Sequence, residues 1–110
     1  RCLDVFALTS LWEGLPRVYL EALASGVPIV GTRVDGADEV IRDGVNGYLL
    51  KPGDVDGLSV RVLQILSNPG ELTQNKHSLL ASEFDIWEMV RRQEVEYQKL
   101  IDSLSSRAVA

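Results

Sequence analysis

The sequence predicts an α/β fold, in which three parallel strands carry flanking helices and form half of a doubly wound, Rossmann-like sheet. Short apolar runs alternate with helical segments along the 110 residues, and glycine turns separate them. The run at 27–31 is β-branched and continuously apolar, which is typical of a parallel strand covered on both faces. A chain of this length makes at most one domain.

The first part of the chain predicts a strand, a helix and a second strand. The apolar run 5–8, preceded by Leu3, predicts the first strand. Residues 16–25 predict a helix, since Pro16 suits a first helical position, where its missing N–H has no partner. Gly26 stands where a left-handed residue often ends a helix. The run 27–31 then predicts the second strand.

Turn pairs organise the middle of the chain. Asp35-Gly36 and Asn46-Gly47 predict turns around a short helix at 37–42, and residues 47–50 predict the third strand. Asp54 predicts the cap of a further helix. That helix is predicted to end at Asn68-Pro69-Gly70. Its apolar positions recur at helical spacing and are Leu58, Val62, Ile65 and Leu66.

Two more helices are predicted in the C-terminal part. Residues 71–82 read as one, and residues 85–104 as a long last helix with an apolar stripe. The stripe comprises Ile86, Val90, Tyr97, Ile101 and Leu104, with Trp87 beside it. Residues 105–110 predict a frayed tail. The domain organisation is therefore one partial domain over 1–104, followed by this tail.

Composition excludes several classes of function. The formal net charge of −5 argues against nucleic acid or an anionic membrane as a general partner. The single cysteine, Cys2, excludes an internal disulfide and a cysteine-rich metal site. The one histidine, His77, lies in a polar stretch, and no cluster of metal ligands is visible. With no signal peptide and no membrane-spanning apolar run, we expect a cytoplasmic protein.

The start of the helix at Pro16 is the strongest candidate for a binding site. Leu15, before it, has no side-chain oxygen to cap the helix, so the N–H groups of Arg17 and Val18 need other acceptors. A phosphate supplies such acceptors, because a helix N-terminus concentrates donors and partial positive charge. The competing interpretation of Arg17 is an exposed surface side chain.

Two carboxylates flank this helix start. Glu13 precedes it and Glu21 follows in the second turn, with seven residues between them. Glu21 is placed to accept hydrogen bonds from ribose hydroxyls, and Glu13 from a second polyol. The alternative is that both are surface charges favoured by the helix dipole. Trp12, beside Glu13, is expected to pack beneath the turn.

Several motifs in order resemble a known family. They read VFALTSLWEGLP at 5–16, LEALASGVPIV at 20–30, GADEVI at 36–41, DGVNGYLL at 43–50 and PGD at 52–54. The chain resembles the second half of the C-terminal domain of retaining GT-B glycosyltransferases of the group 1, family 4 type. That family carries a Glu, seven residues, Glu signature (EX7E) at this point.

The resemblance implies a function and roles for the site residues. The donor is a nucleotide sugar, linked to UDP, GDP or ADP, and no cofactor or metal is implied. Glu13 is the catalytic residue that faces the transferred sugar, and Glu21 binds the ribose. The backbone of Gly14, Leu15, Pro16 and Arg17 lies against the diphosphate, and the Gly36 loop lies close to the donor.

The resemblance also implies parts that residues 1–110 do not contain. The acceptor, a glycan or a lipid, is bound by a separate N-terminal domain, and basic phosphate ligands come from the other half of the sheet. We therefore expect a fragment that is inactive alone, from an enzyme located in the cytoplasm or at the inner face of a membrane. Its first strand, left without a neighbour, favours self-association.

Two alternatives stay open beside the transferase. One is a non-catalytic interaction or dimerisation module that binds no nucleotide. The other is a GT-B-fold sugar-nucleotide epimerase, which shares the architecture. The pair of Glu13 and Glu21 with Gly14-Leu15-Pro16 between them favours the transferase.

Overall fold

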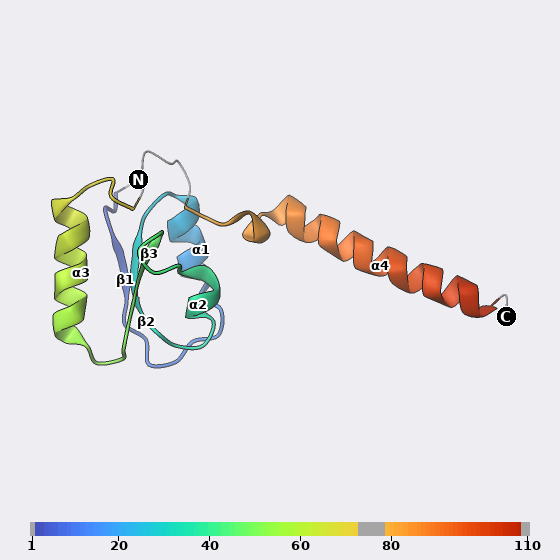
Figure 1. Ribbon diagram of the computed structural model, residues 1–110, viewed down its shortest axis with the longest axis horizontal. Helices are drawn as coiled ribbons and strands as arrows, with labels where there is room; N and C mark the ends of the chain where they lie inside the picture. The colour runs from blue at the N-terminus through green and yellow to red at the C-terminus, as the bar shows by residue number, and fades with distance from the viewer. Residues whose placement is uncertain (1, 73–78, 109–110) are drawn as a thin grey trace. The chain divides into compact units, whose positions relative to one another are not determined.

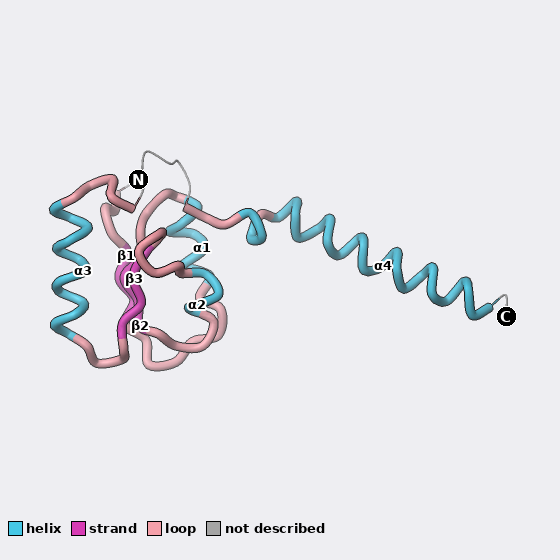
Figure 2. The backbone as a smooth tube through the Cα atoms, viewed as in Figure 1, coloured by secondary structure: helices cyan, strands magenta, loops and turns pink. Residues whose placement is uncertain are grey.

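The computed structural model describes residues 2–72 and 79–108. Two compact units are distinguished, Arg1–Leu80 and Ala81–Ala110, and each is described by itself. Figures 1 and 2 show the elements of both units. In chain order they are β1 (Phe6–Leu8), α1 (Arg17–Ala24), β2 (Ile29–Thr32), α2 (Ala37–Val40), β3 (Gly47–Leu50), α3 (Val55–Ser67), η1 (Ser82–Phe84) and α4 (Ile86–Ala108).

The first unit contains the predicted parallel sheet. Its order is β1-β2-β3, and both neighbouring pairs are parallel, with Phe6 opposite Ile29 and Ile29 opposite Gly47. All four residues of β2 are buried, as the continuous apolar run predicts. Because β2 is central, β1 is an edge strand. Among the described residues, its hydrogen-bonded neighbour is β2 alone.

Helices cover both faces of this sheet. Figure 1 shows α3 on one side of the strands and α1 with α2 on the other. On the α3 side, Val30 and Tyr48 pack with Ile65 and Leu72 in one buried cluster. On the α1 side, Tyr19 and Leu23 are fully buried, and the Tyr19 ring meets Phe6 edge-on at a centroid distance of 6.4 Å. The fold is therefore the predicted three-layer α/β arrangement.

Local signals in the sequence place most element ends correctly. Gly26 has a φ of 68°, the left-handed conformation predicted for the end of α1. The Asp54 carboxylate accepts a hydrogen bond from the Gly57 N–H at 2.8 Å, so it caps α3 as predicted. The short helix α2 ends at Val40, two residues before the predicted end, because Ile41 turns to an extended conformation.

Two predictions near the C-terminus are wrong in the part that the structure describes. The expected helix at 71–82 is a turn at Glu71 and Leu72 and has no helical residue from Leu79 to Ala81, while 73–78 lie outside the described residues. The last helix does not end at Leu104 but continues to Ala108. No glycine or proline interrupts it there, and the Ser105 and Ser106 hydroxyls donate back to carbonyls one turn earlier.

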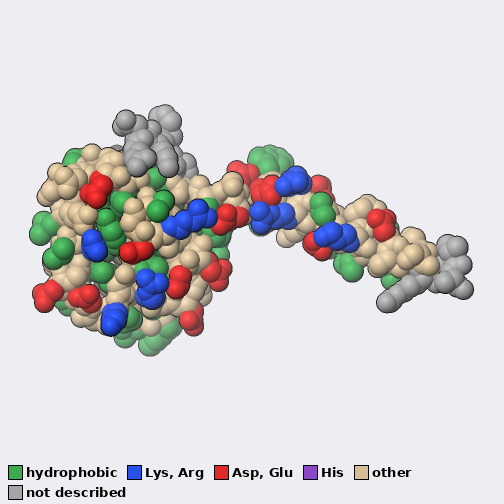
Figure 3. All heavy atoms as spheres, in the orientation of Figure 1, with side chains coloured by type: hydrophobic (Ala, Val, Ile, Leu, Met, Phe, Trp, Pro, Cys, Tyr) green, Lys and Arg blue, Asp and Glu red, His purple; other side chains and the backbone are tan. Residues whose placement is uncertain are grey.

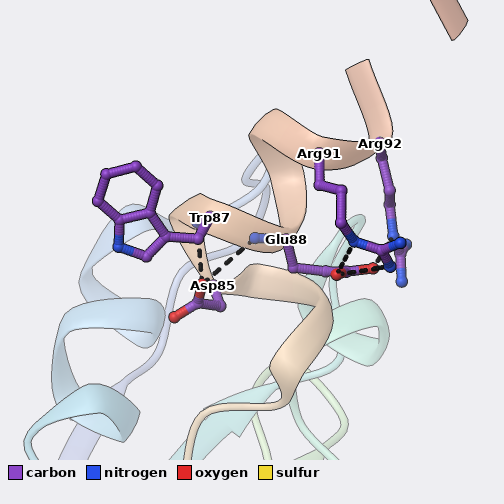
Figure 4. A network of polar contacts seen from close by, with 5 residues as sticks. All are labelled: Asp85, Trp87, Glu88, Arg91 and Arg92. Atoms are coloured by element: carbon purple, nitrogen blue, oxygen red, sulfur yellow. Dashed lines mark hydrogen bonds and ion pairs between the residues drawn. The ribbon is translucent and has the colours of Figure 1, made fainter. Parts of the chain in front are cut away.

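The second unit is a 3-10 turn followed by α4. Figure 4 shows how α4 begins: the Asp85 carboxylate accepts from the N–H groups of Trp87 at 2.9 Å and Glu88 at 3.3 Å. Glu88 in turn forms ion pairs with Arg91 at 2.9 Å and Arg92 at 2.8 Å. Within this unit, four residues of the predicted stripe are exposed, namely Ile86, Tyr97, Ile101 and Leu104, and Trp87 beside them is 77% exposed.

Candidate functional site

Two loops meet at the carboxyl end of the sheet, where open α/β sheets bind ligands. The loop after β1 is joined to β2 by the Thr32 hydroxyl, which donates to the Ser10 carbonyl oxygen at 2.5 Å. The loop after β2 touches it again, because a Cβ built on Gly36 would collide with the Gly14 carbonyl. Gly36 has a φ of 77°, which an L side chain rarely adopts. The two loops therefore meet at this end of the sheet.

The start of α1 leaves backbone donors open. Pro16 is the N-cap of α1 and not its first helical residue as predicted, with φ −68° and ψ 108° and no side-chain cap hydrogen bond. The Tyr19 N–H donates to the Pro16 carbonyl at 3.0 Å, whereas the N–H groups of Arg17 and Val18 have no acceptor among the described residues. No acidic side chain lies in the first turn. The predicted deficit of acceptors is therefore present, and an anion fits it.

Glu13 is held by its own loop. The Ser10 hydroxyl donates to Glu13 Oε1 at 2.6 Å, and this pair is partly buried. No ion pair engages Glu13 within the described residues, and the nearby Arg17 side chain is exposed. The carboxylate is thus fixed through one oxygen, which leaves Oε2 for a ligand.

Glu21 lies in the second turn of α1. It is exposed and lines a hollow of about 260 Å³ together with Phe6, Val18 and Ala22. Glu13 does not line this hollow. The structure therefore brings Gly14, which follows Glu13 in the chain, against Gly36, whereas Glu21 lines a hollow that Glu13 does not line.

A larger hollow of the first unit lies elsewhere. Its volume is about 710 Å³, and it is lined by residues near the amino ends of β1 and β2, such as Asp4 and Pro28. None of the predicted site residues lines it. A smaller hollow of about 320 Å³ lies at the carboxyl ends of the strands, between Thr9, Thr32 and Leu58. The rule for open α/β sheets favours this end over the larger hollow.

Tyr19 is an unexpected feature beneath the site. Its side chain is fully buried, and its hydroxyl has no hydrogen-bond partner among the described residues. A Cβ on Gly31 would collide with that hydroxyl, so glycine is what admits the ring against β2. Burial, and then the negative charge of Glu13, raise the pKa of Tyr19 above its ordinary value. The hydroxyl therefore stays protonated beneath Glu13.

Sequence reasoning missed three residues and misplaced one. No sequence motif marks Ser10 or Thr32 as a site residue. Thr32 nevertheless ends a buried apolar run, and Ser10 stands three residues before Glu13. Tyr19 gave no signal, since its position on α1 reads simply as apolar core. Trp12 does not pack beneath the turn as predicted but is 81% exposed, because the loop turns it outward.

Other classes of site find little support in the described part of the chain. Residues 2–72 and 79–108 contain no group of three or more His, Cys, Asp or Glu side chains able to hold a metal ion. His77 lies outside those residues. Helices that combine the length and apolar character needed to cross a bilayer are absent from the same ranges. On the face shown in Figure 3, acidic and basic side chains of the larger unit are interspersed.

Comparison with known families gives a match over most of the chain. The family model described as glycosyl transferases group 1 matches residues 1–78. That range contains both loops, α1 and the whole sheet.

Individual proteins of known function are similar over the same region. The N-acetyl-alpha-D-glucosaminyl L-malate synthase of Bacillus anthracis is 44% identical over 72 residues, 66% of this chain and 19% of that protein. The lipopolysaccharide core biosynthesis glycosyltransferase LpsE of Rhizobium meliloti is 36% identical over 84 residues, 74% of this chain and 25% of that protein. The MMP alpha-(1->4)-mannosyltransferase of Mycolicibacterium hassiacum is 36% identical over 102 residues, 89% of this chain and 25% of that protein. The chain thus spans about a fifth to a quarter of these relatives.

Proposed function

The chain belongs to the glycosyl transferases of group 1, and we propose that it is the donor-binding part of a retaining GT-B enzyme. The complete enzyme would transfer a sugar from a nucleotide-activated donor to an acceptor, a glycan or a lipid bound by another domain. The donor nucleotide is UDP, GDP or ADP. The similarity to three transferases and synthases of sugar-containing products supports this reaction class.

The uncapped start of α1 carries the proposal. As the bond between the sugar and the diphosphate breaks, the leaving diphosphate gains negative charge. The open N–H groups of Arg17 and Val18 offer fixed donors at a positive helix end, where that charge is stabilised. Gly14 and Gly36 let the backbone of both loops approach the diphosphate, since neither carries a side chain there.

The two glutamates have separate tasks in this proposal. Glu21 accepts hydrogen bonds from the ribose hydroxyls, and its exposed position on α1 leaves it accessible for them. Glu13 faces the transferred sugar with its free Oε2 and is the catalytic residue. No metal or cofactor is needed for this assignment, and the enzyme works in the cytoplasm or at the inner face of a membrane.

Donor binding by the complete enzyme tests the proposal. Glu21→Gln should weaken the binding of a nucleoside diphosphate by roughly 1.5–3 kcal/mol, because a charged hydrogen-bond acceptor is lost. Calorimetric titration measures this loss. Glu94→Gln is the matched control, since Glu94 is an exposed glutamate on α4. Equal affinities for both variants would remove the ribose role from Glu21.

The 110 residues alone should bind such a diphosphate only at millimolar level, about 4 kcal/mol. They should also transfer no sugar, because acceptor groups and basic phosphate ligands are expected from other parts of the enzyme. Turnover of a radiolabelled donor by the purified chain would contradict this.

A second candidate function is an interaction module that dimerises through β1. The observation that favours it is the edge position of β1, whose flanking Leu3 is 57% exposed. An apolar edge strand without lysine or proline pairs readily with another copy. Light scattering of the chain at micromolar concentration distinguishes a dimer from a monomer. A monomer with a protected Val5 amide would exclude edge pairing. The Phe6 amide does not distinguish the two outcomes, because it already donates to the Pro28 carbonyl within the sheet.

A further inference from the structure

We propose that Ser10 and Thr32 are positioning residues that hold the Glu13 carboxylate in one orientation during sugar transfer. The inference rests on the proposed function, in which Glu13 faces the transferred sugar. It assigns a task to two hydroxyl side chains that neither the motif nor the family comparison singles out.

The contact between Ser10 and Glu13 is short and local. The Ser10 hydroxyl donates to Oε1 at 2.6 Å, within the range of a hydrogen bond to a charged oxygen. Both groups are partly buried, so water competes less for the carboxylate than on an open surface. A free glutamate side chain samples several rotamers, whereas this hydrogen bond selects one.

Thr32 connects this pair to the rigid part of the fold. It is the last residue of β2, stands opposite Leu50 of β3, and is only 5% exposed. Its hydroxyl donates to the Ser10 carbonyl oxygen. The order of support therefore runs from the central strand to Thr32, then to Ser10, and finally to the carboxylate.

A second anchor lies on the other side of Glu13. Gly36 is pressed against the Gly14 carbonyl, so the residue after Glu13 is fixed by the loop that follows β2. Glu13 thus stands between two points at which the end of β2 and its loop hold the loop after β1. Such an arrangement orients a charged group before the reaction, which avoids reorganisation in the transition state.

Loss of this support should affect chemistry more than binding. The donor is proposed to be held by the α1 start and by Glu21, and neither depends on Ser10. In the complete enzyme, Ser10→Ala should therefore lower kcat roughly tenfold and change the donor KM less than about twofold. Thr32→Val should lower kcat about threefold, since it acts through one more contact.

Conservative variants separate positioning from a general loss of structure. Ser10→Thr and Thr32→Ser keep the hydroxyls and should retain most of kcat. Ser59→Ala is the matched control, because Ser59 is an exposed residue of α3 and its hydroxyl donates to the Val55 carbonyl of the same helix. It should leave kcat and KM unchanged.

A double-mutant cycle decides whether Ser10 acts through Glu13. In the Glu13→Gln background, Ser10→Ala should add no further loss of kcat. Two results would overturn this inference but not the proposed function. One is a further tenfold loss of kcat from Ser10→Ala in the Glu13→Gln background. The other is a normal kcat for Ser10→Ala when Glu13→Gln is impaired. A normal kcat for Glu13→Gln overturns the proposed role of Glu13, and this inference with it.

Discussion

The helices α1 and α4 begin in opposite ways. At α4, the Asp85 carboxylate accepts from two N–H groups of the first turn, and Glu88 adds negative charge where the dipole favours it. At α1, Pro16 offers no side-chain oxygen, and the first turn has no acidic residue. The backbone donors at the start of α4 therefore have side-chain acceptors from the same segment, whereas those at the start of α1 do not.

The difference is that α4 carries its own cap, whereas the start of α1 keeps backbone donors to which we propose that a ligand binds. Capping contributes about 1 kcal/mol, so an open start costs stability unless something else supplies the acceptors. At α1 the open donors lie beside two loops that glycines bring together, Gly14 and Gly36. At α4 the acceptor is supplied by Asp85, the residue directly before the helix.

The largest expected effect comes from disturbing the loop contact before α1. Gly36→Ala should lower the free energy of unfolding by about 3 kcal/mol, because it adds a positive-φ penalty and a collision with the Gly14 carbonyl. Urea denaturation measures the change. Gly44→Ala is the control, since Gly44 has a φ of 72° but no atom within 4 Å of an added Cβ. Its loss should be about 1 kcal/mol; equal losses would mean that the two loops are not in firm contact.

The next effect concerns the buried hydroxyl on α1. Tyr19→Phe should raise the free energy of unfolding by about 1–2 kcal/mol at neutral pH, because it removes an unpaired buried polar group. Tyr97→Phe, at an exposed position, is the control. A destabilised Tyr19→Phe would show that the hydroxyl has a partner in solution.

The same variant has a predicted pH dependence. Burial, then the Glu13 charge, raise the pKa of Tyr19 above 10.0. The unfolded chain loses the Tyr19 proton near pH 10 while the folded chain keeps it, so stability is full below that pH and falls as pH rises through the folded pKa, by up to about 1.4 kcal/mol per unit. Denaturation at pH 9 and 11 should show this fall in the wild type and a smaller fall in Tyr19→Phe.

Removing the cap of α4 should have a smaller, local effect. Asp85→Ala should destabilise the first turn by about 1 kcal/mol. Hydrogen exchange at the amides of Trp87 and Glu88 should then be faster, whereas Asp85→Asn, which keeps a side-chain acceptor, should exchange almost as the wild type. No difference between the two variants would show that the cap contributes little.

Giving α1 the kind of cap that α4 has should produce the smallest effect. Pro16→Ser places a hydroxyl where it accepts from the N–H of Val18 or Tyr19, and so competes with a bound phosphate. Diphosphate affinity of the complete enzyme, measured by calorimetry, should fall by about 0.5–1 kcal/mol relative to Pro16→Ala, which offers no acceptor. Indistinguishable affinities would mean that these donors do not contact the diphosphate.

The fold was predictable where the signal is local. The continuous apolar run around β2, the left-handed Gly26 and the Asp54 cap each depend on a few neighbouring residues. The helix expected at 71–82 is absent from its described ends, 71–72 and 79–81, because apolar spacing alone cannot tell a helix from irregular chain that buries Leu72 and Leu79. Tertiary context decides such segments.

The candidate site was predictable only in part. The missing cap at Pro16 follows from the sequence, since it depends on which side chains lack an oxygen. The contact of Thr32 with Ser10 joins residues 22 positions apart, and the unpaired Tyr19 hydroxyl depends on how α1 packs on β2. Such contacts form only when the sheet is assembled, so no residue spacing in the sequence predicts them.

The exposed Trp12 makes the intrinsic fluorescence of the chain sensitive to changes at this loop. The chain has two tryptophans, Trp12 beside Glu13 and Trp87 on α4, and both indoles are largely in water. Replacing Trp87 by phenylalanine leaves one tryptophan, at the loop where the donor is proposed to bind. Its emission then records, without any label, whether a bound molecule or a neighbouring domain displaces water from that loop.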